Sequence, residues 1–114
     1  MVARNRLYEA LPYPVEQALK NVGRNLRSAR LRRDQTIQQV AERIGTGPRA
    51  VRDAESGKAS TGVAVYAALL WAYDLLDSIE RLADPLTDKE GLALAAAKEG
   101  KRARIKSGGI DNEF

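Results

Sequence analysis

The sequence contains no cysteine and no histidine, and each absence excludes a class of chemistry. Without cysteine the chain forms no disulfide framework, no thiolate nucleophile and no thiolate metal site. Without histidine it lacks the residue that most often serves as general base or metal ligand. No glycine-rich phosphate loop and no carboxylate cluster on one helix face takes their place. We therefore expect no enzyme activity, no cofactor and no metal.

Aromatic residues and long apolar runs are also scarce. One Trp, four Tyr and one Phe are too few for a platform on which single-stranded nucleic acid stacks. The longest uncharged apolar run covers twelve residues, 62–73, whereas a membrane-spanning helix needs about 20. The basic N-terminus is not followed by the apolar core of a signal peptide. We expect a cytoplasmic protein with no membrane partner.

What is present is charge, unevenly distributed. The chain of 114 residues is 44% hydrophobic and 30% charged, as in a soluble domain, and its net charge is +4. Residues 1–34 carry a net charge of +5, residues 35–58 of +1, residues 59–97 of −4 and residues 98–114 of +2. The basic N-terminal segment, residues 1–34, and the acidic segment, residues 59–97, favour a molecule with two differently charged faces. One face would bind a polyanion and the other a different partner.

The apolar spacing predicts an all-α protein. From Val15 to about Arg33 the apolar residues recur every three or four positions, which defines one face of a helix. Pro12 and Pro14 precede it and predict an N-terminal arm over residues 1–14. The main domain is expected over residues 15–85. A C-terminal helix from about Lys89 to Lys98, followed by a basic flexible tail, is expected within residues 86–114.

Residues 36–57 have the signals of two short helices joined by a tight turn. Thr36 can N-cap the first of them, with Gln39 completing a capping box. Gly45 suits a left-handed C-cap, and the turn ends at Gly47, followed by Pro48 at the first position of the next helix. Two short helices joined by a glycine-containing turn are typical of a helix-turn-helix.

The second of these helices has a polar outward face. At 100° per residue, Val51 and Ala54 point inward. The opposite side presents Arg49, Arg52, Asp53 and Ser56. Arginine pairs with guanine O6 and N7 in the major groove, and aspartate accepts a hydrogen bond from cytosine N4. The alternative is an ordinary solvated surface.

The segment 26–73 resembles the Cro/C1-type (XRE) helix-turn-helix family, to which lambdoid phage repressors belong. The resemblance rests on the R-x-x-R end of the first helix, on T-x-x-Q-V-A-E-R-I-G and on V-R-D-A-E-S-G-K. It implies a compact five-helix Cro/C1 repressor-like domain that binds double-stranded, palindromic operator DNA.

The same resemblance assigns DNA-contacting positions. It places Arg49 and Asp53 at base edges, with Pro48 and Arg52 beside them, and Lys58 on the DNA backbone. Gly47 stands at the N-cap position, where its N–H can meet a phosphate. Ile37 occupies a position that usually carries a phosphate-contacting Gln, so Gln38 or Gln39 is expected to substitute for it.

The family also pairs the positions of Arg30 and Glu55 in a partly buried salt bridge. Arg30 lies at the edge of the apolar face of the first helix, and Glu55 at the edge of the inward face of the recognition helix. We therefore predict a structural ion pair. The alternative is two independent surface charges.

The apolar run 62–73 predicts a second contact surface. A helix that is apolar nearly all round must be covered nearly all round, and a small domain covers only one side of it. A two-fold dimer that reads half-sites about 34 Å apart would cover the rest. The expected interface residues are Trp71, Tyr73, Leu75, Leu76 and Ile79. The alternative is a core formed within one chain.

Residues 82–114 resemble the tail of HipB-like antitoxins, small XRE proteins encoded beside HipA-type kinase toxins. The likeness lies in the L-A-D-P at its start, the five basic residues within 98–106 and the acidic-aromatic ending. It implies an autoregulating repressor with a HipA-like kinase as partner. Two alternatives stay open: a protein whose main role is to hold the kinase, and a stand-alone regulator. The tail itself could also be a solvated end.

Overall fold

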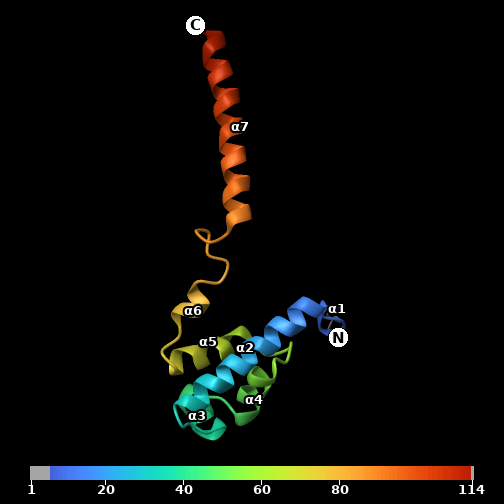
Figure 1. Cartoon of the computed structure of the whole chain (residues 1–114), viewed down its shortest axis with the longest axis vertical. Coiled ribbons are helices and arrows are strands. Elements are labelled where there is room, and N and C mark those ends of the chain that lie inside the picture. The colour runs from blue at the N-terminus through green and yellow to red at the C-terminus, as the bar shows by residue number, and fades with distance from the viewer. Residues whose placement is uncertain (1–5, 114) are drawn as a thin grey trace. The chain divides into compact units, whose positions relative to one another are not determined.

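The computed structural model describes the backbone of residues 6–113 and the side chains of residues 6–105. The elements in this part are α1 (Arg6–Glu9), α2 (Tyr13–Arg32), α3 (Ile37–Ile44), α4 (Pro48–Ser56), α5 (Val63–Ala72), α6 (Asp77–Glu80) and α7 (Lys89–Glu113) (Figure 1). No strand occurs among the described residues, and the predicted all-α fold is confirmed. The chain divides into two units, residues 1–79 and residues 80–114.

The N-terminal segment is more helical than predicted. An arm was expected through residue 14, but α2 already begins at Tyr13, and Arg6–Glu9 forms the short helix α1. Pro12 is the N-cap of α2, and Pro14 lies in its first turn. Proline is tolerated there because the N–H groups of a first turn have no intrahelical partner to lose.

Local capping signals set the limits of α3. The Thr36 hydroxyl oxygen accepts a hydrogen bond from the Gln39 N–H at 3.1 Å, and the Gln39 side-chain oxygen accepts one from the Thr36 N–H at 2.9 Å. Gly45 ends the helix with φ +80°, a left-handed conformation that costs glycine little. The predicted start of this helix and the predicted turn after it are both confirmed.

The core of the first unit lies where α4 packs against α2, α3 and α5 (Figure 1). Its buried apolar residues are Leu26, Ala29, Val40, Ala41, Val51, Ala54, Leu69, Ala72 and Tyr73. Each of the four helices contributes a small apolar patch, so α4 is held from three sides.

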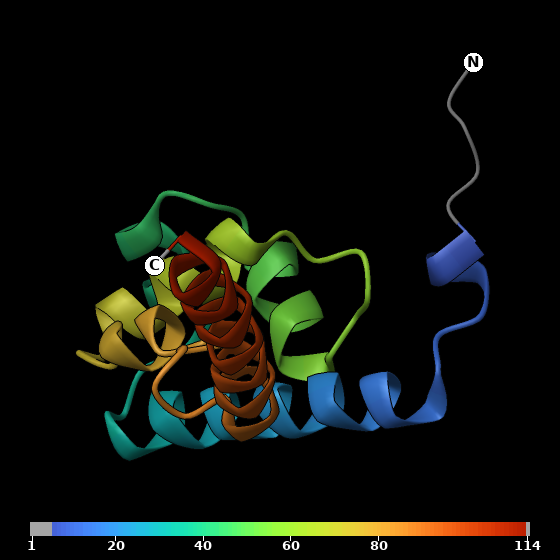
Figure 2. The same cartoon turned by 90° about the horizontal axis from the view of Figure 1, so that it is seen from above.

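The backbones of α2 and α4 approach each other closely (Figure 2). A Cβ atom on Gly23 would meet the carbonyl oxygen of Glu55, and one on Gly57 would lie 2.8 Å from the backbone of Lys20. Gly57 also has φ +74°, which ends α4 in the left-handed conformation. Glycine at these two positions therefore fixes how near α4 comes to α2.

The second unit contains α7, which is longer than predicted. The helix was expected to give way to a flexible tail near Lys98, but it continues to Glu113. Residues 95–106 are mostly Ala, Lys, Arg and Glu, which are strong helix formers, and no proline follows Pro85. The start is capped by Asp88, whose carboxylate accepts a hydrogen bond from the Gly91 N–H at 2.9 Å. No helix in the described part of the chain is both long enough and apolar enough to cross a membrane.

Candidate nucleic-acid interface

The burial of α4 fixes which of its side chains face outward. Val51 and Ala54 are completely buried, with exposed fractions of 0%. On the opposite side Arg49, Arg52 and Ser56 are exposed and Asp53 is half-buried. The structure therefore brings the four residues predicted for the polar outward face together on one side of α4. Arg49 and Asp53, the two predicted to reach base edges, are among them.

Some side chains of this face are already hydrogen-bonded or ion-paired within the protein, and others are free to contact a ligand. The Asp53 carboxylate lies 3.7 Å from the Lys58 ammonium, and the Ser56 hydroxyl donates to the Asp53 backbone carbonyl at 3.0 Å. Among the described residues, no hydrogen bond or ion pair engages the guanidinium of Arg49 or Arg52. The two arginines are thus the strongest available donors on the face.

The start of α4 offers backbone donors. Gly47 is the N-cap, in an extended conformation with φ −80°, and has no side chain to cap the helix. A Cβ atom at this position would meet nothing within 4 Å, so the approach to it is open. The N–H groups of a first turn lack intrahelical acceptors and attract anions. Pro48 has no N–H and so cannot donate a hydrogen bond to DNA. Its predicted role is limited to its place beside the residues at base edges.

The two glutamines proposed to substitute at Ile37 are exposed but engaged within α3. Gln38 donates from its side-chain nitrogen to the Glu42 carboxylate at 3.2 Å, and the side-chain oxygen of Gln39 belongs to the capping box. Ile37 is half-buried and packs against the core. A DNA contact by Gln38 would require it to leave Glu42, whereas Gln39 would keep a nitrogen donor while capping the helix.

Arg30 and Glu55 form a two-pronged ion pair between α2 and α4. The Nε of Arg30 donates to Oε2 of Glu55 at 2.8 Å, and its Nη2 donates to Oε1 at 3.1 Å. The side chains are only 9% and 7% exposed. The remaining prong, Nη1, donates to the Gln35 carbonyl at 2.9 Å. The hydrogen bond to Glu55 raises the pKa of Arg30 against the opposing effect of burial.

Arg33 is a positioning residue that the sequence analysis missed. From the end of α2 it donates to the Tyr73 carbonyl at 2.9 Å and to the Ala29 carbonyl at 2.9 Å. Its guanidinium also lies 5.4 Å from the centre of the Tyr73 ring. These contacts fasten the end of α5 to α2. No pattern in the sequence marks this arginine, because its acceptor lies forty residues away.

The predicted dimer residues do not all reach the surface. Tyr73 is 1% exposed and belongs to the core to which α2, α3, α4 and α5 all contribute, so its assignment to a dimer interface is wrong. Its burial raises the pKa of the Tyr73 hydroxyl. Trp71 is 54% exposed and Leu76 is 36% exposed. Leu75 and Ile79 are half-buried.

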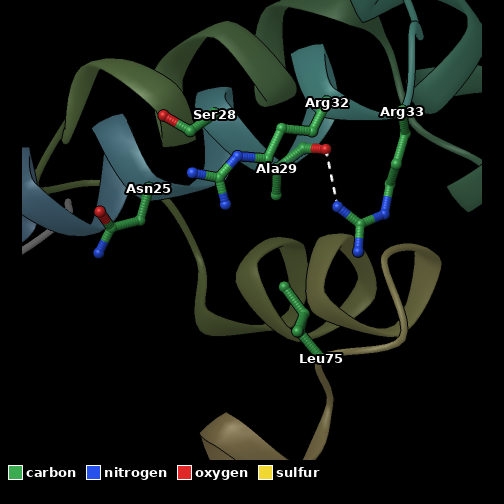
Figure 3. Close-up of a pocket in the computed structure, with 6 residues that line it drawn as sticks. All are labelled: Asn25, Ser28, Ala29, Arg32, Arg33 and Leu75. Atoms are coloured by element: carbon green, nitrogen blue, oxygen red, sulfur yellow. Dashed lines mark hydrogen bonds between the residues drawn. The ribbon is translucent and has the colours of Figure 1, made fainter.

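Trp71 and Leu75 each lie near arginine side chains of other helices. The Arg43 guanidinium, on α3, lies 5.8 Å from the centre of the Trp71 ring. Leu75 points toward α2 across a hollow of about 360 Å³, into which Arg32 and Arg33 also reach (Figure 3). Asn25, Ser28 and Ala29 complete the lining. Trp71 and Leu76 are therefore the more outward part of the predicted interface.

A family model described as a helix-turn-helix domain matches residues 21–84, which is more than half of the chain. The comparisons with curated proteins and with solved structures found no match to this chain. The matched segment contains both partners of the ion pair, the turn after α3 and the whole outward face of α4.

Proposed function

Because the chain belongs to the helix-turn-helix domain family, we propose that it is a transcriptional repressor that binds double-stranded operator DNA through α4. The observation that carries this proposal is the outward face of α4, where Arg49 and Arg52 are exposed and have no protein partner among the described residues. The buried residues on the other side of α4 and the ion pair to α2 hold this face in one orientation.

In the proposed complex, α4 lies in the major groove. Arg49 would pair with guanine O6 and N7, with Arg52 beside it, and Asp53 would accept from cytosine N4. The N–H groups at Gly47 and the Lys58 ammonium would contact phosphates, which positions the helix without reading sequence. Ser56 and one of the glutamines, Gln38 or Gln39, would contribute further polar contacts. Occupation of the operator would exclude RNA polymerase from the promoter.

The proposal is tested by selecting binding sites from a pool of random duplexes. We expect repeated rounds with the full chain to enrich an inverted repeat whose half-sites are about 34 Å apart, the separation read by a two-fold dimer. Guanines should be over-represented in each half-site, because two arginines face the groove. A pool that shows no enrichment after selection would contradict sequence-specific binding.

The inverted repeat presupposes a homodimer, and we propose that its interface forms around Trp71 and Leu76. Both are large apolar side chains exposed at the end of α5 or just after it. Leu75 and Ile79 would add their exposed parts. A stable two-fold interface of this kind buries about 1,200 Å² or more, so these four residues would form its centre.

Trp71→Asp is expected to convert the dimer into a monomer, because the substitution places a charge in an apolar interface without a partner. Sedimentation at tens of micromolar should show the change, and circular dichroism should show unchanged helix content. Val63→Asp is the matched control, since Val63 is exposed on the same helix but outside the proposed interface. An unmutated chain that sediments as a monomer would contradict the proposal.

We further propose that this repressor is the antitoxin side of a toxin–antitoxin pair, with a HipA-like kinase as partner. The support is the resemblance of residues 82–114 to the tails of HipB-like proteins, together with the negative charge of residues 59–97. The alternatives are a protein that mainly holds the kinase and a regulator with no toxin. Co-purification of a kinase from the native host, with and without operator DNA, distinguishes the three.

A further inference from the structure

A second positively charged surface lies on α7, outside the segment matched by the family model. At 100° per residue, Lys98, Lys101 and Arg102 fall within an arc of about 100° on this helix. We call these three residues the basic face. All three side chains are exposed.

The basic face has no acidic partner within the described part of the chain. No hydrogen bond or ion pair is formed there by its three side chains. Lys98 is three residues from Lys101 and four from Arg102, so like charges are neighbours on the helix surface and repel each other. The nearest acidic residue in sequence, Glu99, is three residues before Arg102 and lies about 60° from it round the helix, beyond the edge of the basic face. No ion pair between Glu99 and Arg102 is formed in the structure. An anionic partner would therefore relieve the repulsion between Lys98 and its two basic neighbours.

We propose that the basic face of α7 binds the phosphate backbone of the DNA beside the site read by α4. This inference rests on the proposed function and adds to it a second, sequence-independent contact. DNA is favoured over a membrane or an apolar protein groove because both of those need a continuous apolar stripe. Within residues 98–105 only Ile105 is large and apolar, whereas phosphates need only cations. Because α7 is tethered to the helix-turn-helix unit, its second contact forms at high effective concentration.

The test replaces all three residues in the full chain with glutamine, which is also a good helix former. The probe is a 40-base-pair duplex with the selected site at its centre. Each neutralised phosphate contributes about −0.9 to the slope of log affinity against log salt, so three lost contacts should make the slope about 2.7 shallower. The affinity ratio of unmutated chain to variant should then fall about 40-fold between 50 mM and 200 mM salt.

The matched control is the charge-preserving variant Lys98→Arg, Lys101→Arg and Arg102→Lys, which should keep the original slope. Trimming the duplex to the selected site should remove the difference between the unmutated chain and the glutamine variant. A glutamine variant with an unchanged salt slope on the 40-base-pair duplex would overturn the inference. The basic face would then be expected to bind a protein instead of DNA. If that result accompanies a clear loss of affinity for Arg49→Ala, the proposed function stands and only the role of α7 falls.

Discussion

Glu55→Gln is expected to lower the free energy of unfolding by about 3–5 kcal/mol, the usual cost of breaking a buried ion pair by removing one partner. The substitution keeps the size of the side chain but leaves the Arg30 guanidinium, 9% exposed, without a counter-charge. The new amide nitrogen would also face a donor of Arg30, since both carboxylate oxygens accept from it in the structure. Urea unfolding followed by circular dichroism measures the change.

The exposed pair between Glu16 and Lys20 is the matched control. Its side chains are 3.0 Å apart but 43% and 45% exposed, and exposed pairs typically contribute about 0.2–1 kcal/mol. Glu16→Gln should therefore change the free energy of unfolding by much less than Glu55→Gln. Equal effects of the two substitutions would show that Arg30 and Glu55 behave as independent surface charges, which is the alternative considered for them.

The elements around the candidate site were predictable because their signals are local. Thr36 and Gln39 are three residues apart, so one short pattern contains the whole capping box. Gly45 and Pro48 act through their own backbone preferences, which do not depend on distant residues. The outward face of α4 followed from helical geometry once its start was known.

The features that were missed depend on contacts between distant segments. The run 62–73 is apolar on every side, so the sequence could not tell that Tyr73 is buried while Trp71 is exposed. Which side of this run faces the core is decided by the packing of α5 against α3 and α4, and the sequence of the run does not show that packing. Arg33 was missed for the same reason, because its acceptor is the carbonyl of Tyr73. For α7, glycine positions favoured a tail, while the Ala, Lys and Arg content favoured the helix that forms.

Arg49→Ala is expected to weaken binding to the selected duplex by about 1–3 kcal/mol, which is about 5- to 150-fold, and to relax the preference for one base. The reason is that the Arg49 guanidinium is exposed on the outward face of α4 and forms no hydrogen bond or ion pair with any residue that the structure describes. Titration against duplexes carrying each of the four bases at the affected position measures both effects. A footprint on the selected site that is unchanged by the substitution would show that this face does not read DNA.

Two further variants separate base reading from simple attraction to phosphate. Arg49→Lys keeps the positive charge but loses the two-pronged geometry that fits guanine, so it should lose base preference nearly as completely as alanine does. Lys58→Ala should instead weaken all duplexes alike and make the salt slope about 0.9 shallower. Lys58 lies 3.7 Å from Asp53, so its loss also frees that carboxylate. If Arg49→Lys retained full preference, Arg49 would be a phosphate contact, and base reading would have to come from Arg52 and Asp53.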